Sequence, residues 1–353
     1  MTVPPILCVV GASGSGKTTL LEGLVAKLAG EALKVGAIKH AAGGLDLTAA
    51  GKDSSRLAEA GARPVVAAGP GELTVTGGAV DASPAELAER FCGACDLVLA
   101  EGFKRSPHDK VLVAAETAAG EAAGISSVRL AVAGAERDDI SAIAAWVRQW
   151  LGRRRELRAG VIGAILAGGQ SRRMGTDKAA LRLQGQPVLA HLAELLADRV
   201  EAVWVVGRSG PDELAGRFVR WHLDLRAGCG PLGGVATALH LAADNGPRAV
   251  LAVACDLPAL GADVIDGLLE GRQRDAAASA VRNPSTGRVE PLMAVYEPDV
   301  LAEVERALDA GRRSATALLE AVGAHVVEID PSLAGQLVNV NTPGDLDRIE
   351  GRP

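Results

Sequence analysis

Short apolar runs that end in Gly or Asp recur along this chain of 353 residues, and amphipathic segments separate them. Six of these runs lie in the first half, from ILCVV to RLAVAG, and six lie in the second half, from VIGAILAGG to HVVEID. Such runs are typical of strands that are buried on both faces of a sheet. Leucines at helical spacing between them, such as Leu20, Leu24 and Leu28, predict helices that cover the sheet. We therefore expect an α/β fold with parallel strands and with ligands at their carboxyl ends.

The length of the chain is more than one compact core usually serves, so two domains are expected. The boundary is easiest to place in WVRQWLGRRRELRAG, where a helix is expected to end near Gly152. We interpret the basic run that follows as part of a solvated linker over residues 153–159, between domains at 1–152 and 160–353. The two halves carry different glycine-rich loops, so they look fused rather than duplicated.

Charge and cysteine content limit the classes of partner. A net charge of −6 argues against general nucleic-acid binding, which usually needs a basic surface. Five cysteines, and no apolar run long enough for a signal peptide or a membrane span, predict a cytoplasmic protein without a membrane partner. Cys92 and Cys95 form a single C-x-x-C without a second ligand pair nearby, so we interpret them as ordinary cysteines rather than a zinc or redox site.

The first glycine-rich loop, GASGSGKTTL, fits the phosphate-binding pattern G-x-x-x-x-G-K-[ST] between a buried run and an amphipathic helix. Glycines let backbone N–H groups turn toward a phosphate, and the helix N-terminus adds partial positive charge. Lys17 is expected to neutralise the β and γ phosphates of a nucleotide, and Thr18 to ligate Mg²⁺. The predicted nucleotide-binding residues of this loop are Gly11, Ala12, Ser13, Gly14, Ser15, Gly16, Lys17, Thr18 and Thr19.

The first half as a whole resembles the molybdopterin-guanine dinucleotide biosynthesis adaptor family, through VGAIKH, GKDSSRLAEAGA and DLVLAEGFKRSPHDKV. The resemblance covers roughly residues 5–150 and implies a P-loop NTPase-like sheet that binds GTP, hydrolyses it weakly and is often dimeric. It makes Asp53 and Glu101 candidates near the metal and the γ-phosphate. The family usually has further histidines where this chain reads KHAAGG and keeps only His40. GTP binding is therefore expected more firmly than hydrolysis, and this half could instead be a non-catalytic GTP-binding module.

The second glycine-rich loop, LAGGQSRRMGTDK, lacks the G-K-[ST] sequence and must hold phosphate in another way. Gly168 and Gly169 leave room for a triphosphate beside the backbone, and Arg173 and Lys178 supply positive charge. Taken alone, this strand–turn–helix pattern is also that of a plain tight turn.

Polar residues follow several later apolar runs, in chain order. Asp224 and Asp256 each come at the end of a predicted strand, and Asn339 and Asn341 are predicted at the end of another, in LVNVNTPGDL. An acid such as Asp256 at a strand end is well sited to hold Mg²⁺, which prefers carboxylate and phosphate oxygens. Because carboxyl ends of parallel strands meet at one edge, these residues are expected to form one ligand site.

Together these segments closely resemble molybdenum cofactor guanylyltransferase over about residues 160–350. The combination of LAGGxSxRMGxDK, GPLGG, CDLP and NVNTPxDL carries the resemblance. It implies a Rossmann-like nucleotidyltransferase fold of the nucleotide-diphospho-sugar transferase type, and transfer of GMP from GTP to molybdenum-molybdopterin with release of pyrophosphate. Cytidylyltransferase relatives usually read LAAG at the first motif, so LAGG favours guanine. A related enzyme that uses CTP or a sugar phosphate acceptor is the alternative.

The resemblance assigns roles to positions of this chain in three groups. The catalytic positions are Arg173, Lys178 and Asp256, with Asp256 as the Mg²⁺ ligand. The GTP-binding positions are Leu166, Ala167, Gly168, Gly169, Lys178, Val206, Asp224 and Asp256. The acceptor-side positions are Gly230, Pro231, Leu232, Gly233, Glu290 and Asn341. Where the family often has a nucleotide-binding Asn, this chain has Val206 and Gly207, so only a backbone contact is expected there.

The implied substrates and partners follow from that reaction. The nucleophile is a phosphate that is already anionic at neutral pH, so charge neutralisation and positioning matter more than a general base. The resemblance implies GTP and molybdopterin as ligands, Mg²⁺ as the metal, and molybdoenzyme apoproteins, their chaperones or molybdenum-insertion proteins as protein partners. It also implies a homodimer formed through the first half.

Overall fold

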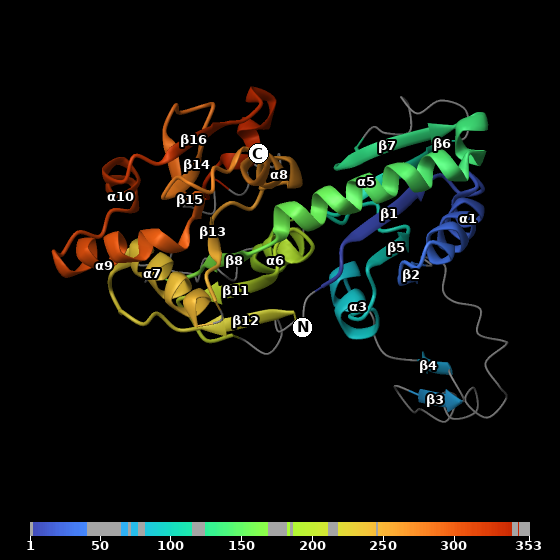
Figure 1. The fold of residues 1–353 in the computed structure, drawn as a ribbon, viewed down its shortest axis with the longest axis horizontal. Coiled ribbons are helices and arrows are strands. Elements are labelled where there is room, and N and C mark those ends of the chain that lie inside the picture. Colours follow the sequence, from blue (N-terminus) through green and yellow to red (C-terminus); the bar gives the residue numbers. More distant parts are fainter. Residues whose placement is uncertain are drawn as a thin grey trace.

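The computed structural model describes residues 3–40, 65–69, 72–76, 82–114, 124–168, 182–183, 186–210, 218–244 and 246–340, together with Asp345. It contains two main β-sheets, one in each half of the chain, with helices packed against them (Figure 1). The α/β architecture predicted from the alternating runs is confirmed.

The first sheet has five strands in the order β2-β5-β1-β6-β7, and they pair in parallel. Its strands are β1 (Ile6–Gly11), β2 (Val35–Lys39), β5 (Leu97–Glu101), β6 (Asp109–Ala114) and β7 (Val128–Ala133). All the carboxyl ends therefore lie at one edge, which is where the GASGSGKTTL loop follows β1.

Helices cover the two faces of this sheet differently. On one face, leucines of the first helix and apolar residues of the last pack against alternate residues of the strands. The helices are α1 (Lys17–Gly30), α3 (Pro84–Phe91) and α5 (Ile140–Arg158), and a 3₁₀ helix, η1 (Gly134–Asp138), follows β7. Helix α3 packs on the opposite face and begins with a capping box, in which Ser83 and Glu86 each bond the other's backbone N–H.

The run RPVVAAG forms a strand outside the main sheet. Strand β3 (Val65–Gly69) pairs antiparallel with β4 (Glu72–Thr76) in a two-stranded sheet of its own. The expectation of a parallel strand is wrong here, because β4 begins three residues after β3 ends and a parallel pair needs a much longer crossover.

The second sheet has seven strands in the order β12-β11-β8-β13-β15-β14-β16. They are β8 (Val161–Leu166), β11 (Ala202–Val206), β12 (Val219–His222), β13 (Ala249–Ala254), β14 (Ala278–Arg282), β15 (Val289–Tyr296) and β16 (His325–Glu328). Strand β15 runs antiparallel to both of its neighbours, in contrast to the expected parallel arrangement, because only a short connection joins β14 to it. Its first residues therefore lie at the carboxyl edge of β13, where Met293 pairs with Val253.

Helices pack on both faces of the second sheet. One face carries α6 (Val188–Ala197) and α8 (Ala262–Gly271). The other face carries α7 (Gly230–Ala243), α9 (Leu301–Asp309) and α10 (Ala315–Ala321). Two short 3₁₀ helices, η4 (Pro298–Val300) and η5 (Pro331–Leu337), and a small ladder of β9 (Arg182–Leu183) and β10 (Gln186–Pro187) complete the described elements.

The basic run that was predicted to be a solvated linker is the end of α5, a single helix of 19 residues. Arg153 and Arg155 are exposed, but Arg154 is 5% exposed and pairs with Asp109 and Asp266. The prediction of a solvated linker is therefore wrong for these residues. Asp109 and Asp266, which are far away in sequence, neutralise the charge of Arg154 and so allow its burial. The division into domains at 152 and 160 stays a prediction. No helix within the described ranges combines the length and apolar character needed to cross a bilayer.

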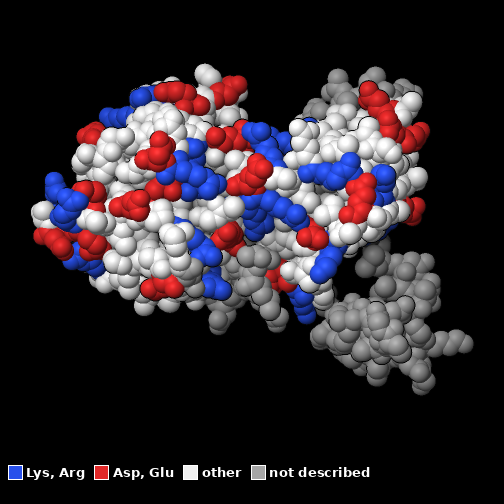
Figure 2. Space-filling model, viewed as in Figure 1, with Lys and Arg blue, Asp and Glu red and all other residues white. Residues whose placement is uncertain are grey.

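The two halves of the chain are in direct contact. Helix α5 runs from the first sheet toward the second half, and α6 lies between the two sheets (Figure 1). Figure 2 shows acidic and basic side chains intermingled over the region where the halves meet. Two ion pairs cross this contact, one between Arg153 and Glu270 and one between Arg129 and Asp263.

Candidate functional site

The GASGSGKTTL loop has the backbone shape of a phosphate-binding turn. Gly14 and Gly16 have φ of 75° and 90°, a left-handed conformation that glycine adopts without strain. Gly16 caps the N-terminus of α1, and Ala12, Ser13 and Gly14 are exposed. The Lys17 ammonium group donates a hydrogen bond to the Ala12 carbonyl oxygen. The lysine thus lies over the turn, at the helix N-terminus where a phosphate is best stabilised.

Two further residues meet the loop at the carboxyl edge of the first sheet. Thr18 Oγ1 donates to Glu101 Oε2 at 3.0 Å, and Lys39 Nζ lies 3.4 Å from the same oxygen. A hydroxyl and a carboxylate oxygen are ligands that Mg²⁺ accepts, the rest of its shell being water and phosphate. These donors therefore fit the metal expected beside a bound triphosphate. Asp53, the other predicted candidate, lies outside the described residues.

The sequence reasoning missed a cation at this loop, Arg137 of η1. Its Nη1 donates to the carbonyl oxygen of Ser15 at 3.2 Å. The side chain also packs on Gly16, where a Cβ would lie 3.2 Å from Arg137 Cδ. A signal was present, because GAERD directly follows the last apolar run of this half and so begins at the same sheet edge.

The C-x-x-C pair lies in this half but away from the loop. A Cβ on Gly36 of β2 would lie 2.9 Å from Cys92 Sγ and 3.2 Å from Cys95 Sγ, so both sulfurs pack on this strand. Burial and the neighbouring Cys95 raise the pKa of Cys92 to about 11, which leaves it a thiol at neutral pH. Among the described residues, no three His, Cys, Asp or Glu side chains gather as a metal site.

The ends of four strands of the second sheet are tied together by backbone hydrogen bonds. Ala167 N donates to Val206 O at 2.9 Å, and Gly207 N donates to His222 O at 2.8 Å. These bonds join the turn after β8 to β11 and then to β12. Cys255 N donates to Leu166 O at 3.4 Å, which brings in the loop after β13.

Gly168 and Gly207 touch at this edge through their backbones. A Cβ on Gly207, whose φ is 100°, would lie 2.4 Å from Gly168 Cα. A Cβ on Gly168 would lie 3.0 Å from Asp224 Oδ2. The family's side-chain amide at the end of the second strand therefore has no space in this chain, and the strand end offers its backbone instead.

Asp224 is the acid that faces this glycine contact. Its Oδ1 is buried without a hydrogen-bond partner among the described residues. Burial raises the pKa of this carboxyl group. A buried carboxylate oxygen without a partner is costly unless a ligand supplies a donor, so Asp224 is suited to accept a hydrogen bond from a bound molecule.

His222 lies two residues before Asp224 and was not predicted. Its Nε2 is also buried without a partner in the described part of the chain, and its ring meets Trp204 edge-on at 5.2 Å. Burial, with a smaller effect of Arg220, lowers the pKa of His222 and favours the neutral ring. The run RWHLDL carried a signal for this residue, since it places His222 at the end of a predicted strand and two residues before Asp224.

Asp256 follows β13 by two residues at the same edge. Its backbone carbonyl accepts a hydrogen bond from Val340 N at 2.9 Å. Residues 338–340 are not a strand, so the predicted strand end at Asn339 is wrong: η5 precedes this segment and the loop after β13 holds it in place. Gly169, Arg173, Lys178 and Asn341 lie outside the described residues.

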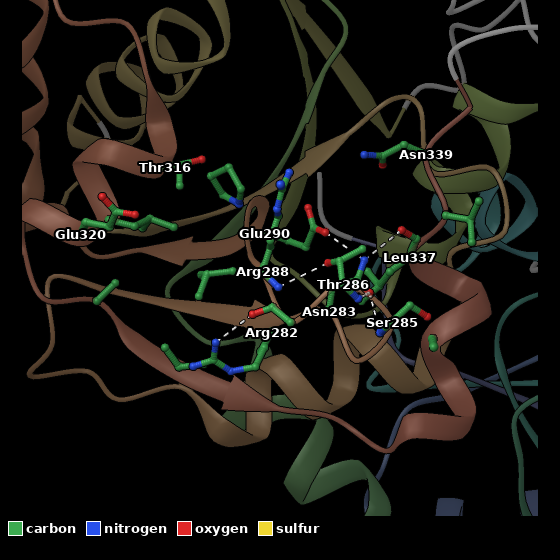
Figure 3. Close-up of a pocket in the computed structure, with 18 of the residues that line it drawn as sticks. Arg282, Asn283, Ser285, Thr286, Arg288, Glu290, Thr316, Glu320, Leu337 and Asn339 are labelled. Carbon is green, nitrogen blue, oxygen red and sulfur yellow. Dashed lines mark hydrogen bonds between the residues drawn. The ribbon is translucent and has the colours of Figure 1, made fainter.

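A cavity of about 950 Å³ opens beside residues 338–339, and we call it the β14–β15 cavity. The connection between β14 and β15, helix α10, Ala334 and residues 337–339 line it. Asn283 Nδ2 donates to Glu290 Oε1 at 2.9 Å, and Figure 3 shows these two side chains turned toward one another with Asn339 at the rim. Glu290, predicted on the acceptor side, is thus part of the cavity wall.

The cavity is lined by charged groups that the sequence reasoning did not single out. Arg288 is exposed, and Arg282 donates to Glu328 Oε1 and to Gly287 O. Glu320 of α10 also lines the cavity (Figure 3). Arg282 and Arg288 belong to β14 and to its connection with β15. Because β15 runs antiparallel to both of its neighbours, a pattern of parallel strands gave no sign of this cavity.

The GPLGG segment forms the first turn of α7, as the glycines predicted. Gly230 and Pro231 are exposed, but Leu232 is fully buried in the apolar core and Gly233 is buried beneath Cys229. Of the four predicted acceptor-side positions here, the structure leaves only Gly230 and Pro231 open to a ligand.

Two family descriptions match the chain, one in each half. Residues 6–136 match Molybdopterin guanine dinucleotide synthesis protein B, and residues 163–326 match the MobA-like NTP transferase domain. Both kinds of domain are therefore present in one chain, with a P-loop region first and a nucleotidyltransferase region second.

Individual proteins are similar to one half each. A probable molybdenum cofactor guanylyltransferase of Opitutus terrae is 36% identical over 190 residues, which is 53% of this chain and 93% of that protein. Molybdopterin-guanine dinucleotide biosynthesis protein A of Archaeoglobus fulgidus is 27% identical, with a TM-score of 0.44 over 54% of this chain and 97% of that structure. MobB of Bacillus subtilis is 27% identical, with a TM-score of 0.35 over 41% of this chain and 97% of that structure.

Proposed function

The chain belongs to the molybdenum cofactor guanylyltransferase family through its C-terminal half, and from that premise we propose that it transfers GMP from GTP to molybdopterin. The chain is a nucleotidyltransferase, and the proposal adds the nucleotide, the acceptor and the residues that bind them. The N-terminal half, which matches synthesis protein B, is proposed to bind a second GTP.

What supports the proposal is a cluster of predicted GTP-binding residues and a cavity on the same sheet edge. Transfer of a nucleotide needs a triphosphate and a second phosphate-bearing substrate held in line. Gly168, Gly207 and Asp224 converge at one end of this edge, and the β14–β15 cavity lies toward the other. Asp256 stands between them, because Val340, next to the cavity-lining Asn339, is bonded to its carbonyl.

The surface beside the contact of Gly168 and Gly207 is proposed to receive GTP. The two glycines pack on one another, so the turn after β8 and the end of β11 offer backbone groups to a phosphate or a base there. Guanine presents a ring N–H beside its N2 amino group, and a carboxylate can accept from both, whereas cytosine offers only the N4 amino donor. The buried and unpartnered oxygen of Asp224 supports such a role for this residue.

The β14–β15 cavity is proposed to receive molybdopterin. The amide group of Asn339 suits the donors and acceptors of a pterin ring, and Arg282 and Arg288 suit its phosphate. Asn283 donates to Glu290 Oε1 and to Leu337 O, so it orients the Glu290 carboxylate before a ligand arrives.

The proposed reaction is a single displacement at phosphorus. An oxygen of the molybdopterin phosphate forms a bond to the α-phosphorus of GTP, and the bond from that phosphorus to the β-phosphate oxygen breaks. Pyrophosphate leaves with the electron pair, and no proton must be removed from the nucleophile. Arg173 and Lys178 are proposed to offset the charge of the two phosphate groups.

Divalent metal is proposed at two places. Asp256 would hold Mg²⁺ in the transferase site, and Thr18 with Glu101 would hold it in the P-loop site. Bound Mg²⁺ would supply positive charge between phosphate oxygens and so reduce their mutual repulsion. The oxygen donors present at both places suit this ion.

The P-loop half is proposed to bind GTP and to hydrolyse it weakly or not at all. Of the histidines near the end of β2 only His40 is present, and its ring packs on Phe103 at 5.0 Å. Dimerisation through this half, and contact with molybdoenzymes or their chaperones, remain proposals that rest on the resemblance.

Incubation of the whole chain with GTP, MgCl₂ and molybdate-loaded molybdopterin, followed by mass spectrometry, tests the function directly. We expect molybdopterin guanine dinucleotide and pyrophosphate in equal amounts. A parallel incubation with CTP should give no dinucleotide. Formation of the cytidine product at a similar rate would instead favour the CTP-using alternative, and no product with either nucleotide would refute the proposed transfer.

A further inference from the structure

One face of the first sheet is packed by the second half of the chain. Side chains of β1 alternate, so Leu7 and Val9 pack with α1 and α5, whereas Cys8 and Val10 face the other way. This second set is continuous with buried residues of α6 and α8 in a single apolar cluster. The two halves therefore share one apolar cluster, in addition to the clusters that belong to each half alone.

A buried histidine joins the two halves within this contact. His108, fully buried, lies just before β6 of the first sheet. Its Nε2 is 2.8 Å from Glu194 Oε1 of α6, and its Nδ1 is 3.4 Å from Asp198 Oδ1, just past the end of that helix. Glu194 also accepts a hydrogen bond from Ala85 N of α3 at 3.0 Å. The segment around His108 is thus fixed to α6 at two points.

The neighbouring residue, Asp109, ties the same segment to α8 through shared arginines. Asp109 accepts hydrogen bonds from Arg129, Arg154 and Arg199. The same three arginines also donate to Asp266 of α8. Two acids, one from each half, therefore share three guanidinium groups, so displacing either acid disturbs the other.

The segment over residues 101–109 begins at Glu101, the acid of the P-loop site. Glu101 accepts from Thr18 Oγ1 at 3.0 Å, and only six residues separate it from His108. Gly102 N is bonded to Val9 O, and the chain then turns through Phe103, which has a φ of 55°. A bulky residue in this conformation is held there by its surroundings at some energetic cost.

Internal hydrogen bonds brace the part of the segment around His108. The Lys110 ammonium group, itself buried, donates to the carbonyl oxygens of Ser106 and His108, at 2.6 Å and 2.9 Å. Ser106 Oγ lies 3.6 Å from Cys8 Sγ of β1. A shift at Glu101 therefore has few ways to be absorbed before it reaches His108.

The two helices that this segment holds lead back to the transferase site. Helix α6 begins at Val188, after the LAGGQSRRMGTDK loop and the β9–β10 ladder. Helix α8 begins at Ala262, six residues after Asp256. A helix moves nearly as a rigid rod, so a shift at its buried end repositions the loop that precedes it.

We propose that residues 101–109 couple the P-loop site to the transferase site, so that a nucleotide on the first half alters the rate of transfer by the second. The coupling rests on the proposed GTP binding by the first half. Glu101 responds to the nucleotide and its metal, and His108 and Asp109 pass the change to α6 and α8.

A double-mutant comparison of transfer kinetics in the full chain tests the coupling. Lys17→Ala removes the P-loop ammonium group, and we expect it to change kcat/KM for GMP transfer by about fivefold or more. In a His108→Gln background, where the charge between Glu194 and Asp198 is gone, the same Lys17→Ala change should alter transfer by less than about twofold. In a background of Arg153→Gln, which breaks only the exposed pair with Glu270, its full effect should persist.

The possible outcomes distinguish failure of the proposed coupling from failure of the proposed GMP transfer. If the chain transfers GMP but Lys17→Ala leaves the rate unchanged, the coupling is refuted while the function stands. If Lys17→Ala acts equally with and without His108→Gln, the path through His108 is refuted. Should His108→Gln not fold, Glu194→Gln takes its place, because the amide oxygen can still accept from Ala85 N.

Hydrogen exchange gives a readout that does not depend on transfer. With a non-hydrolysable GTP analogue, we expect slower amide exchange in residues 102–110 and also in residues 188–200. Both changes should vanish in Lys17→Ala, which keeps the transferase site. A change confined to residues 102–110 would show that nothing passes to α6, and would overturn the proposal even if no transfer were detected.

Discussion

The backbone N–H of Val340 donates a hydrogen bond to the backbone carbonyl oxygen of Asp256, over 2.9 Å. Val340 follows Asn339, which lines the β14–β15 cavity, and Asp256 follows the central strand β13. The bond fixes the cavity wall to the loop that carries the candidate metal ligand. This connection supports the proposal that the acceptor and the metal bind next to one another.

Replacing Asp256 with Ala should therefore lower kcat for GMP transfer by about 100-fold or more, since stabilisation of phosphate charge is lost. The backbone bond to Val340 does not use the side chain, so the fold should be kept. Mass detection of the dinucleotide and a thermal unfolding curve check both parts. Asp275→Ala, the same change at an exposed acid, is the control; transfer at the normal rate by Asp256→Ala would show that the metal assignment is wrong.

A methyl group on Gly207 should weaken the use of GTP. Its Cβ would lie 2.4 Å from Gly168 Cα and 2.5 Å from Gly168 N, so the turn after β8 must move. We expect kcat/KM for GTP to fall about tenfold or more in Gly207→Ala. Gly311→Ala is the matched control, because that glycine also has positive φ, 73°, but nothing lies within 4 Å of its Cβ. Equal losses in the two variants would attribute the effect to backbone strain rather than to the glycine contact.

Much of the candidate site follows from strand ends, which the sequence marks clearly. Leu166 ends the buried strand β8, Asp256 follows the buried strand β13, and Asp224 follows the end of β12 by two residues. Parallel strands bring these carboxyl ends to one edge. The cavity wall could not be found in this way. Strand β14, ASAVR, is short and ends in Arg, and the reversed direction of β15 depends on the tight connection between them.

The contact between the halves was hidden for a different reason. Arg154 was interpreted as part of a solvated run because local sequence shows only its basic neighbours. Its partners, Asp109 and Asp266, lie 45 and 112 residues away along the chain. Pairing across such distances leaves no periodic pattern, so a buried ionic contact of this kind must be seen in three dimensions.

Glu101→Gln should make nucleotide binding by the P-loop half less dependent on Mg²⁺. The substitution keeps an oxygen that can accept from Thr18 but removes the negative charge that would attract the metal. Titration calorimetry with GTP, in an Asp256→Ala background and with and without MgCl₂, measures the difference. An unchanged Mg²⁺ effect would place the metal ligand elsewhere.

Removing Arg199 should destabilise the whole chain. The residue is fully buried and bonds Asp109, Asp198 and Asp266, so Arg199→Met leaves buried acids short of a partner. We expect a loss of about 3–5 kcal/mol in the free energy of unfolding. Arg153→Met, which removes an exposed pair, should cost at most about 1 kcal/mol. Similar losses for both in urea denaturation would show that the buried network is not what stabilises the contact.

Stability should fall as the pH rises through the range in which His108 loses its proton. Burial alone would lower the pKa of His108, but Asp198 and Glu194 raise it from 6.5 to about 9, with Arg199 and Lys110 as the nearby cations. The folded state binds the His108 proton more tightly than the unfolded state does. The contribution of protonated His108 to the free energy of unfolding is therefore complete below pH 6.5 and is lost by about pH 9. A rise of that size corresponds to about 3 kcal/mol.

At low pH the stability depends on a different residue, Asp109, and it falls as the pH falls. Burial raises the pKa of Asp109, but Arg199, Arg154 and Arg129 outweigh it and lower the value from 3.8 to about 2. Its contribution is therefore present above pH 3.8 and is lost as the pH falls toward 2. Urea unfolding at pH 6 and at pH 9.5 should show a drop that is much smaller in His108→Gln, whereas the loss below pH 3.8 should remain in that variant. A drop of equal size at high pH in both proteins would mean that other groups, not His108, set the alkaline limit.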